Sequence, residues 1–270
     1  MFEIMLVPFI ACLVLTGIHV YLGFHVIERG VIFLDLALAQ MAALGGIVGM
    51  MLGLAPNSFS LYGVSLLFTF IGAYIFSNLH LKKSKVSQEA FIGICYVVAS
   101  AIAILLLSKS TVEGEMLKDM LVGNILTVSK NEVIFTTFWY MFLGSILYFF
   151  RKNFLQVTKS YQSARVKHSP LWDFCFYALF GMVVTSSVKM AGVFLVFSFL
   201  IVPSVCALIL GKSMMSRLQI GWSIGALASL LGIVASAIFD LPTGAAIVAA
   251  FGFIFGTITL QKFLQSKANK

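Results

Sequence analysis

The sequence contains few charged residues and no stretch with the composition of a soluble domain. Asp, Glu, Lys and Arg make up 10% of its 270 residues, whereas soluble domains have about 25%. Hydrophobic residues make up 60% of the chain, and the mean hydropathy is +1.04. A water-soluble core cannot bury that much apolar surface. The composition therefore excludes a soluble protein and indicates one that crosses a membrane several times.

Motifs for nucleotide binding and for hydrolysis are also absent from the sequence. No GxxxxGK[ST] phosphate loop occurs, so the chain lacks the usual cradle for ATP. There is neither an HExxH helix nor a nucleophile elbow. The four cysteines lie within apolar runs without the spacing of a metal site, and we expect them to be small buried residues. Nothing in these patterns supports an enzyme that acts alone.

Nine apolar runs are long enough to cross a bilayer as helices. A hydrocarbon core of roughly 30 Å needs about 20 helical residues. The first run lacks a basic leader and a cleavage site, so we expect an uncleaved span. No linker divides the chain, and we expect residues 1–270 to form one all-α domain, a polytopic membrane bundle of eight or nine transmembrane helices. The count is eight if the sixth and seventh runs form one interrupted unit. The runs cover residues 4–27, 31–54, 59–79, 90–108, 132–150, 171–188, 190–211, 219–239 and 243–264.

Basic residues predict how the chain is oriented. Lys and Arg cluster after the third, fifth and seventh runs and in the C-terminal tail, whereas the connections near Pro56 and Pro242 have none. Cytoplasmic loops are enriched in Lys and Arg, so this pattern places the N-terminus outside and the C-terminus in the cytoplasm. Lys189, in an expected outward turn, does not fit the pattern. The net charge of +8 reflects this topology rather than binding to nucleic acid.

The run at 31–54 has two strongly polar residues, Asp35 and Gln40, both near its start. An unpaired carboxylate in hydrocarbon is costly, so this pair favours a wet path or a partner helix beside the run. Frequent Ala and Gly residues in the same run allow neighbouring backbones to approach closely. Two interpretations stay open. Either this helix lines a translocation path, or Asp35 caps the helix while Gln40 bonds a neighbouring helix.

Other polar residues in or beside the runs have simpler interpretations. We expect His19 to be a packing histidine and Glu89 to be a first-turn helix acid. His25, Glu28 and Arg29 lie at an expected interface, where a local ion pair or snorkelling side chains account for them.

Two longer connections are candidates for contact with partners. Residues 109–131 suggest an amphipathic piece at the outer interface, either a solvated helix or a gate and docking surface. Residues 151–170 are polar, basic and expected in the cytoplasm. A short helix around residues 160–168 would face a cytosolic partner there, unless the charges of this connection only set the topology.

Four stretches together resemble the permease subunits of bacterial ABC-type importers for zinc, manganese or iron. FLDLALAQMAALGG at 33–46 is similar to the family phrase F-L-G-D-A-L-A-H-A-x-L-x-G, and MLVGNILTVS at 120–129 looks like F-G-D-I-L-x-V-S. KMAGVFLVFSFLIVPSVCALIL at 189–210 resembles V-G-x-L-L-V-x-x-L-L-I-x-P-A-A-x-A, and FDLPTGAAIV at 239–248 is similar to Y-D-x-P-x-G-P-x-I-V. The stretches follow in family order and spacing over nearly the whole chain.

The resemblance implies a function and a set of partners. The chain would be the transmembrane subunit of an importer in the bacterial cytoplasmic (inner) membrane, with a divalent metal, zinc or manganese before iron, as its cargo. A cytosolic ABC ATPase would hydrolyse ATP, so no enzymatic activity and no cofactor of its own are expected. A second permease copy or close paralogue and an extracytoplasmic substrate-binding protein would complete the assembly.

The resemblance also assigns residues to the two membrane faces. The ATPase would couple through residues 160–168, and the binding protein would deliver its substrate to the outer face, near residues 109–125 and 240–244. The coupling residues are Tyr161, Ala164, Arg165, Lys167 and His168, and the outer-face residues are Glu113, Glu115, Asp119 and Asp240.

The chain departs from the family at the expected metal-contact positions. Aligning the shared Ala-Leu-Ala puts Leu36 and Gln40 where the family has its aspartate and histidine. Leucine cannot ligate a metal, and an amide is a poor ligand for a divalent transition metal. Asp35 is one position early, about 100° round the helix. We therefore expect Asp35, Leu36 and Gln40 to line the path, with Asp35 and Gln40 as weak metal ligands in a polar constriction.

Two other functions stay open because of this departure. The chain could be an ABC-type permease for a non-metal small or lipid-like solute, or a non-transporting, ATPase-linked membrane subunit. A secondary transporter is less favoured, since no inverted pair of broken helices with facing acids is evident.

Overall fold

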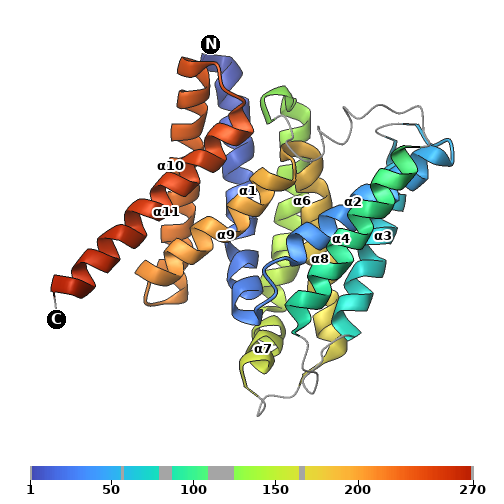
Figure 1. Cartoon of the computed structure of the whole chain (residues 1–270), viewed down its shortest axis with the longest axis horizontal. Helices are drawn as coiled ribbons and strands as arrows, with labels where there is room; N and C mark the ends of the chain where they lie inside the picture. Colours follow the sequence, from blue (N-terminus) through green and yellow to red (C-terminus); the bar gives the residue numbers. More distant parts are fainter. Residues whose placement is uncertain (1, 56–57, 79–86, 109–124, 164–167, 269–270) are drawn as a thin grey trace. The chain divides into compact units, whose positions relative to one another are not determined.

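The computed structural model describes residues 2–55, 58–78, 87–108, 125–163 and 168–268, and all regular structure in these ranges is helical. This confirms the all-α prediction. In chain order (Figure 1), the helices are α1 (Phe2–Arg29), α2 (Leu34–Met51), α3 (Phe59–Asn78), α4 (Gln88–Leu107), the short η1 (Ile125–Thr127), α6 (Lys130–Phe149), α7 (Arg151–Gln162), α8 (Pro170–Ala191), α9 (Val193–Leu210), α10 (Met214–Phe239) and α11 (Thr243–Ala268).

Within the described ranges, nine helices are long and apolar enough to cross a membrane, and they coincide with the nine apolar runs. The sixth and seventh runs form separate helices, α8 and α9, divided by Gly192 alone. Gly192 has φ 78°, a left-handed conformation that favours glycine. Lys189, which does not fit the charge pattern, lies in the last turn of α8.

Several helix ends follow from local side-chain chemistry. The hydroxyls of Ser87 and Ser213 accept backbone N–H groups at the starts of α4 and α10. Ser129 and Glu132 form a reciprocal capping box before α6: the Glu132 carboxylate accepts the Ser129 N–H at 2.9 Å, and the Ser129 hydroxyl accepts the Glu132 N–H at 3.2 Å. Asp240 ends α10 with φ 51°, a conformation that Asp and Asn tolerate better than most residues.

The chain folds into two compact units, each assembled from separated segments. Unit 1 comprises Met1–Phe24, Val122–Trp139 and Met190–Lys270, and unit 2 comprises His25–Leu121 and Tyr140–Lys189. Three of the divisions fall inside α1, α6 and α8, so each of these helices contributes one part to each unit.

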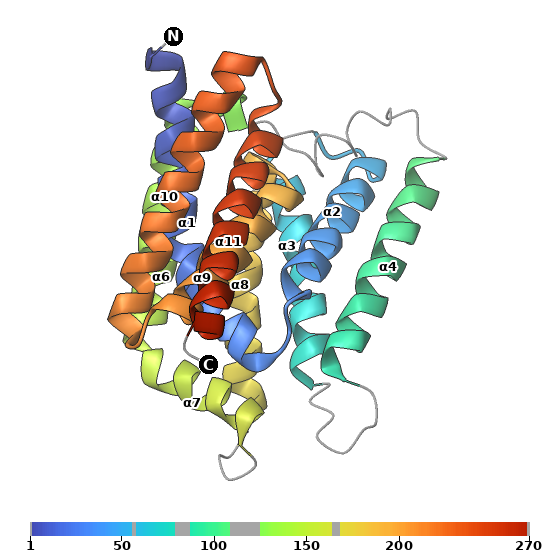
Figure 2. The same cartoon turned by 60° about the vertical axis from the view of Figure 1, so that its left-hand side comes forward.

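Unit 1 is built on close contacts between α9, α10 and α11 and on the packing of α1 against α10. Figure 2 shows α10 and α11 side by side. A β-carbon added to Gly232 of α10 would overlap the backbone of Ile247 in α11, and one added to Gly225 would overlap Thr16 in α1. These small residues permit the near backbone contact that drives helix association in membranes.

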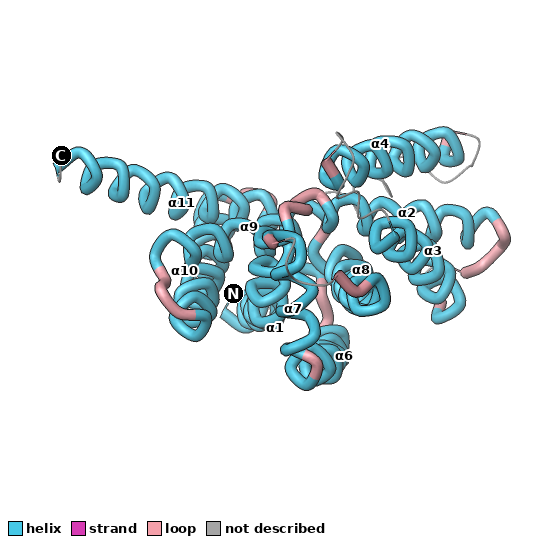
Figure 3. The backbone as a smooth tube through the Cα atoms, turned by 90° about the horizontal axis from the view of Figure 1, so that it is seen from below, coloured by secondary structure: helices cyan, strands magenta, loops and turns pink. Residues whose placement is uncertain are grey.

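In unit 2, α2 packs against both α3 and α4, and Figure 3 shows it between them. A β-carbon on Gly45 of α2 would stand 2.9 Å from the Val64 carbonyl oxygen of α3, which agrees with the close approach expected of this run. Helix α8 packs on α3 in a similar way. Gly181 abuts Thr69, whose hydroxyl lies 3.1 Å from that of Thr185.

The connection between the fifth and sixth runs differs from the sequence prediction. A helix was expected around residues 160–168, but α7 ends at Gln162 and Ser163 is extended. The helix lies at residues 151–162 because this segment is amphipathic. Phe154 and Val157 are buried, and the basic residues of α7 are mostly exposed. The predicted coupling residues Ala164, Arg165 and Lys167 lie outside the described residues, as do Glu113, Glu115 and Asp119 of the predicted outer face.

Candidate functional site

The start of α2 contains a buried carboxylate without a hydrogen-bonding partner. Asp35 lies in the first turn of α2 with 1% of its surface exposed, and neither carboxylate oxygen accepts a hydrogen bond from the described residues. It therefore does not cap the helix through a hydrogen bond, as one interpretation proposed. The N–H of the preceding Phe33 is instead donated to Glu89 of α4 at 3.0 Å. Glu89 is thus a first-turn acid, as expected, and also holds the beginning of α2.

A group of hydroxyls from three other helices is connected to this carboxylate through one member, Tyr140. Tyr140 of α6 is close enough to Asp35 to interact with its charge. The Tyr140 hydroxyl is hydrogen-bonded to Ser187 at 2.5 Å and to Ser186 at 3.3 Å, both on α8. Tyr62 of α3 also lies close to the Ser186 hydroxyl. We call Tyr62, Tyr140, Ser186 and Ser187 the hydroxyl cluster.

Sequence reasoning missed the hydroxyl cluster entirely. Single Tyr and Ser residues inside apolar runs are common and satisfy themselves within their own helix, as Ser187 does at the Val183 carbonyl. The hydroxyl cluster becomes apparent only when α3, α6 and α8 bring its members together, with Tyr140 near Asp35.

The chemistry of this arrangement suits weak attraction for a cation. Carboxylate and hydroxyl oxygens are hard ligands of the kind taken by divalent cations such as manganese. Within the described residues, no three His, Cys, Asp or Glu side chains gather as a metal-holding group. One carboxylate beside hydroxyls would attract an ion without retaining it strongly.

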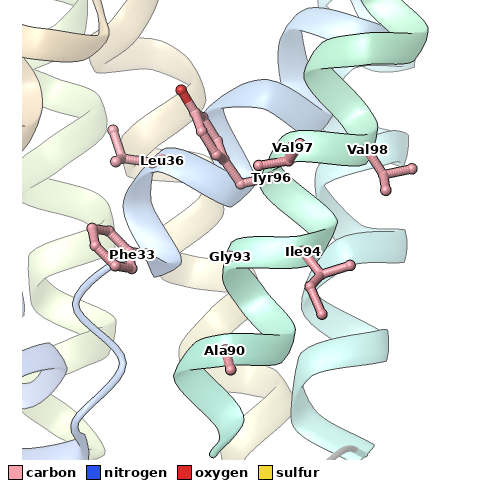
Figure 4. A pocket seen from close by; sticks show the side chains of 8 residues that line it. All are labelled: Phe33, Leu36, Ala90, Gly93, Ile94, Tyr96, Val97 and Val98. Carbon is pink, nitrogen blue, oxygen red and sulfur yellow. The ribbon is translucent and has the colours of Figure 1, made fainter.

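Leu36 faces a different environment from Asp35. It is partly exposed and lines an apolar groove of about 520 Å³ between the start of α2 and α4. Figure 4 shows Phe33 and Leu36 on the α2 side of this groove, with the Tyr96 ring extending from α4 toward them. Gln40, one turn beyond Leu36, is 7% exposed. The helix thus has a leucine and an amide where the resemblance expects metal ligands, while its acid is buried near Tyr140.

The described coupling residues converge on one acid. The Tyr161 hydroxyl, at the end of α7, donates to Asp173 of α8 and is hydrogen-bonded to the Tyr177 hydroxyl at 2.9 Å. Burial, assisted by Tyr177 and Asp173, raises the pKa of Tyr161 well above its usual value, so this hydroxyl stays protonated as a donor. His168 approaches the same acid, with Nε2 at 3.7 Å from the Asp173 carboxylate, while its Nδ1 is hydrogen-bonded to Ser160 at 3.1 Å.

Asp240 is the predicted outer-face residue that the structure describes. It is exposed at the end of α10, and its role at the outer face stays a prediction.

A match to a protein family identifies the class of protein to which this chain belongs. The family model described as "ABC 3 transport family" matches residues 1–261. The chain belongs to this family. Its membership confirms the resemblance, and together with the nine candidate spans it makes the chain a multi-pass membrane protein of a transporter family.

Individual relatives and a solved structure show how far the likeness extends. The chain is 32% identical over 187 residues to the "Probable iron transport system membrane protein" of Haemophilus influenzae, which covers 66% of this chain and 69% of the relative. It is 24% identical over 236 residues to the "Manganese transport system membrane protein MntC" of Halalkalibacterium halodurans, with 87% and 79% covered. Its fold is similar to a chain of "PsaBC from Streptococcus pneumoniae in complex with Fab", with a TM-score of 0.75, 21% identity and coverage of 97% and 94%.

Proposed function

We propose that the chain is the transmembrane subunit of an ABC-type importer and that its cargo is a divalent metal ion. The family match over residues 1–261 carries this proposal. Two relatives, described as iron and manganese transport system membrane proteins, support a metal as the cargo. The lack of a phosphate loop is consistent with ATP hydrolysis by a separate subunit.

The importer needs three partners to complete its cycle. A cytosolic ABC ATPase binds near the connection between α7 and α8, a second permease copy or close paralogue encloses the path, and an extracytoplasmic binding protein delivers the ion. ATP binding and hydrolysis drive transport because the partners bind the inward- and outward-facing states with different affinity. The complex lies in the bacterial inner membrane, with the N-terminus of this chain outside and its C-terminus in the cytoplasm.

The start of α2 is where we place the path. Asp35 and the hydroxyl cluster supply oxygen donors, while Leu36 and Gln40 supply no strong ligand. Oxygen donors suit manganese better than zinc, which favours imidazole and thiolate. Weak binding is compatible with conduction, since a tight site would trap the ion.

The apolar groove at Leu36 favours one alternative cargo. A non-metal small or lipid-like solute would contact Leu36, Tyr96 and Val97 rather than Asp35. The family resemblance alone does not separate this cargo from a metal, because the residues that would ligate the metal have changed here.

Substrate stimulation of the reconstituted complex separates these functions. The chain would be purified with the ATPase and binding protein encoded beside it, placed in nanodiscs, and assayed with manganese, zinc and iron. We expect one of these ions to raise the ATPase rate, and an ATPase lacking its catalytic glutamate to serve as the control. Equal rates with and without every ion would contradict the metal proposal. Failure of any ATPase to bind would contradict the importer itself.

A further inference from the structure

A buried ion pair joins the end of α1 to the beginning of α8. Arg29 Nη1 lies 2.7 Å from the Asp173 Oδ1 atom, and neither side chain is exposed. Arg29 was expected to snorkel at an interface or to pair locally, and the structure corrects that prediction. Burying two charges carries a large desolvation penalty, so a buried pair is weak evidence for stability alone. Its position in the fold gives another reason for its presence.

Helix α7 holds both members of this pair. Thr158 Oγ1 accepts from Arg29 Nε at 2.9 Å, and Tyr161 donates its hydroxyl to the second oxygen of Asp173. The Arg29 guanidinium also lies 3.8 Å from the centre of the Phe176 ring, a cation–π contact. Helix α7 therefore forms one hydrogen bond to the guanidinium, through Thr158, and another to the carboxylate, through Tyr161.

Further contacts join α7 to α1 and α8. His25 Nδ1 is hydrogen-bonded to Thr158 at 2.8 Å, and Gln162 donates to the Glu28 carbonyl at 3.2 Å. The aromatic contacts of α7 with α8, such as Phe154 with Phe176, are apolar. The hydrogen-bonded ion pair is directional, because the planar guanidinium fixes the angle as well as the distance.

The chain from Arg29 to Asp35 is short and internally bonded. Gly30 takes φ 68°, its N–H donates to the Ile27 carbonyl at 3.1 Å, and the Val31 N–H donates to the Val26 carbonyl at 3.2 Å. These are the contacts of a helix ending in a left-handed glycine. A displacement of Arg29 would therefore also move the start of α2, because the turn between them is short and hydrogen-bonded.

We propose that Arg29 and Asp173 act as positioning residues that transmit movement of α7 to the start of α2. The inference rests on the proposed function, since it assumes that the ATPase acts near the connection between α7 and α8. When the ATPase shifts that connection, Tyr161 and Thr158 move the ion pair, and the pair moves α1 and the α1–α2 turn. Access to Asp35 and Gln40 changes as a result.

Three substitutions dissect this link. R29Q and D173N each break the ion pair, whereas Y161F removes one hydroxyl of α7 and leaves the ion pair in place. T69V is the matched control, because it removes one buried hydroxyl and its hydrogen bond between α3 and α8, at a residue outside α7. Each would be combined with Gln40→Cys in a background whose four native cysteines are replaced by alanine.

The measurement is the rate of thiol labelling at position 40 in the complex, with and without ATP. We expect ATP to change this rate in the parent and in T69V. We expect R29Q and D173N to reduce the change about five- to tenfold, the size of a typical coupling between two sites. Y161F should also reduce the ATP-dependent change in labelling rate, and it can be measured even if the ion-pair variants fail to fold.

Each outcome bears on one proposal. If Y161F, together with any ion-pair variant that folds, responds to ATP like T69V at matched melting temperature, the ion pair is only structural and the inference is overturned. A parent that shows no response to ATP overturns it as well. Metal stimulation of the ATPase, measured on the same parent complex, reports separately on the proposed function.

Discussion

Gly232 of α10 lies so close to Ile247 of α11 that a β-carbon at position 232 would overlap the Ile247 backbone. By contrast, Gly252 of α11 has open space around it. The same residue type therefore serves two purposes in neighbouring stretches of unit 1. At position 232 the missing side chain sets the distance between two helices, whereas a β-carbon at position 252 would meet no other atom of the described residues within 4 Å.

Substituting these two glycines should have opposite results. G232A should destabilise the protein by about 1–3 kcal/mol, because the added methyl group forces α10 and α11 apart. G252A should be neutral or stabilising by up to about 1 kcal/mol, because alanine favours a helix. Thermal unfolding in detergent would check both. Equal melting temperatures for the two variants would contradict the helix contact described for unit 1.

Breaking the buried ion pair should lower the stability of the protein, and the effects of the two single substitutions should not be additive. R29Q or D173N alone should destabilise the protein by about 3–5 kcal/mol, because the remaining charge stays buried without its partner. The double variant R29Q/D173N should lose less stability than the sum of the losses of the two single variants, because it leaves neither charge buried without its partner. A double-mutant cycle from chemical denaturation measures this. Strict additivity would show that the two residues do not interact.

Asp35 and Asp173 are both acids inside candidate spans, but their surroundings predict opposite effects of the same substitution. D35N should raise the melting temperature, because it removes a buried carboxylate that has no hydrogen-bonding partner. D173N should lower the melting temperature. If Asp35 lies on the path, D35N should also reduce metal transport although the protein is more stable. A D35N protein that is less stable would show that the carboxylate has a partner in the folded state.

Restoring the ligands that the family resemblance expects should increase metal retention. L36D/Q40H places an acid and an imidazole one turn apart at the start of α2, and the purified protein should retain more zinc or manganese after dialysis. The matched control is F253D/T257H, which places the same pair one turn apart on an exposed face of α11. Equal retention by the two double variants would argue against a path at α2.

The membrane spans were predictable because the bilayer imposes its own length and polarity on them. Each of the nine apolar runs became a helix, and the small residues expected to allow close packing include Gly45, which does so against α3. The bounds of α7 were not predictable from charge alone. Its buried face includes Phe154, which contacts the next helix α8, and Thr158, whose partners His25 and Arg29 lie far away in the sequence on α1.

The polar interior of unit 2 was only partly predictable. Asp35 was identified because an acid inside an apolar run is rare. The partner of Arg29 was missed because 144 residues separate it from Asp173, whereas Glu28 lies directly beside it in the sequence. Tyr140 was missed because a lone tyrosine in a span has no distinctive pattern, and its neighbours Ser186 and Ser187 come from another helix.

The central claim is that this chain moves a divalent metal ion across the membrane under the control of a partner ATPase. Uptake of radioactive manganese or zinc into proteoliposomes tests it most directly, with the chain, its ATPase and its binding protein reconstituted together. We predict uptake that requires ATP and is reduced by D35N. ATP hydrolysis without uptake of either ion or of iron, in vesicles that accumulate another solute, would contradict the claim.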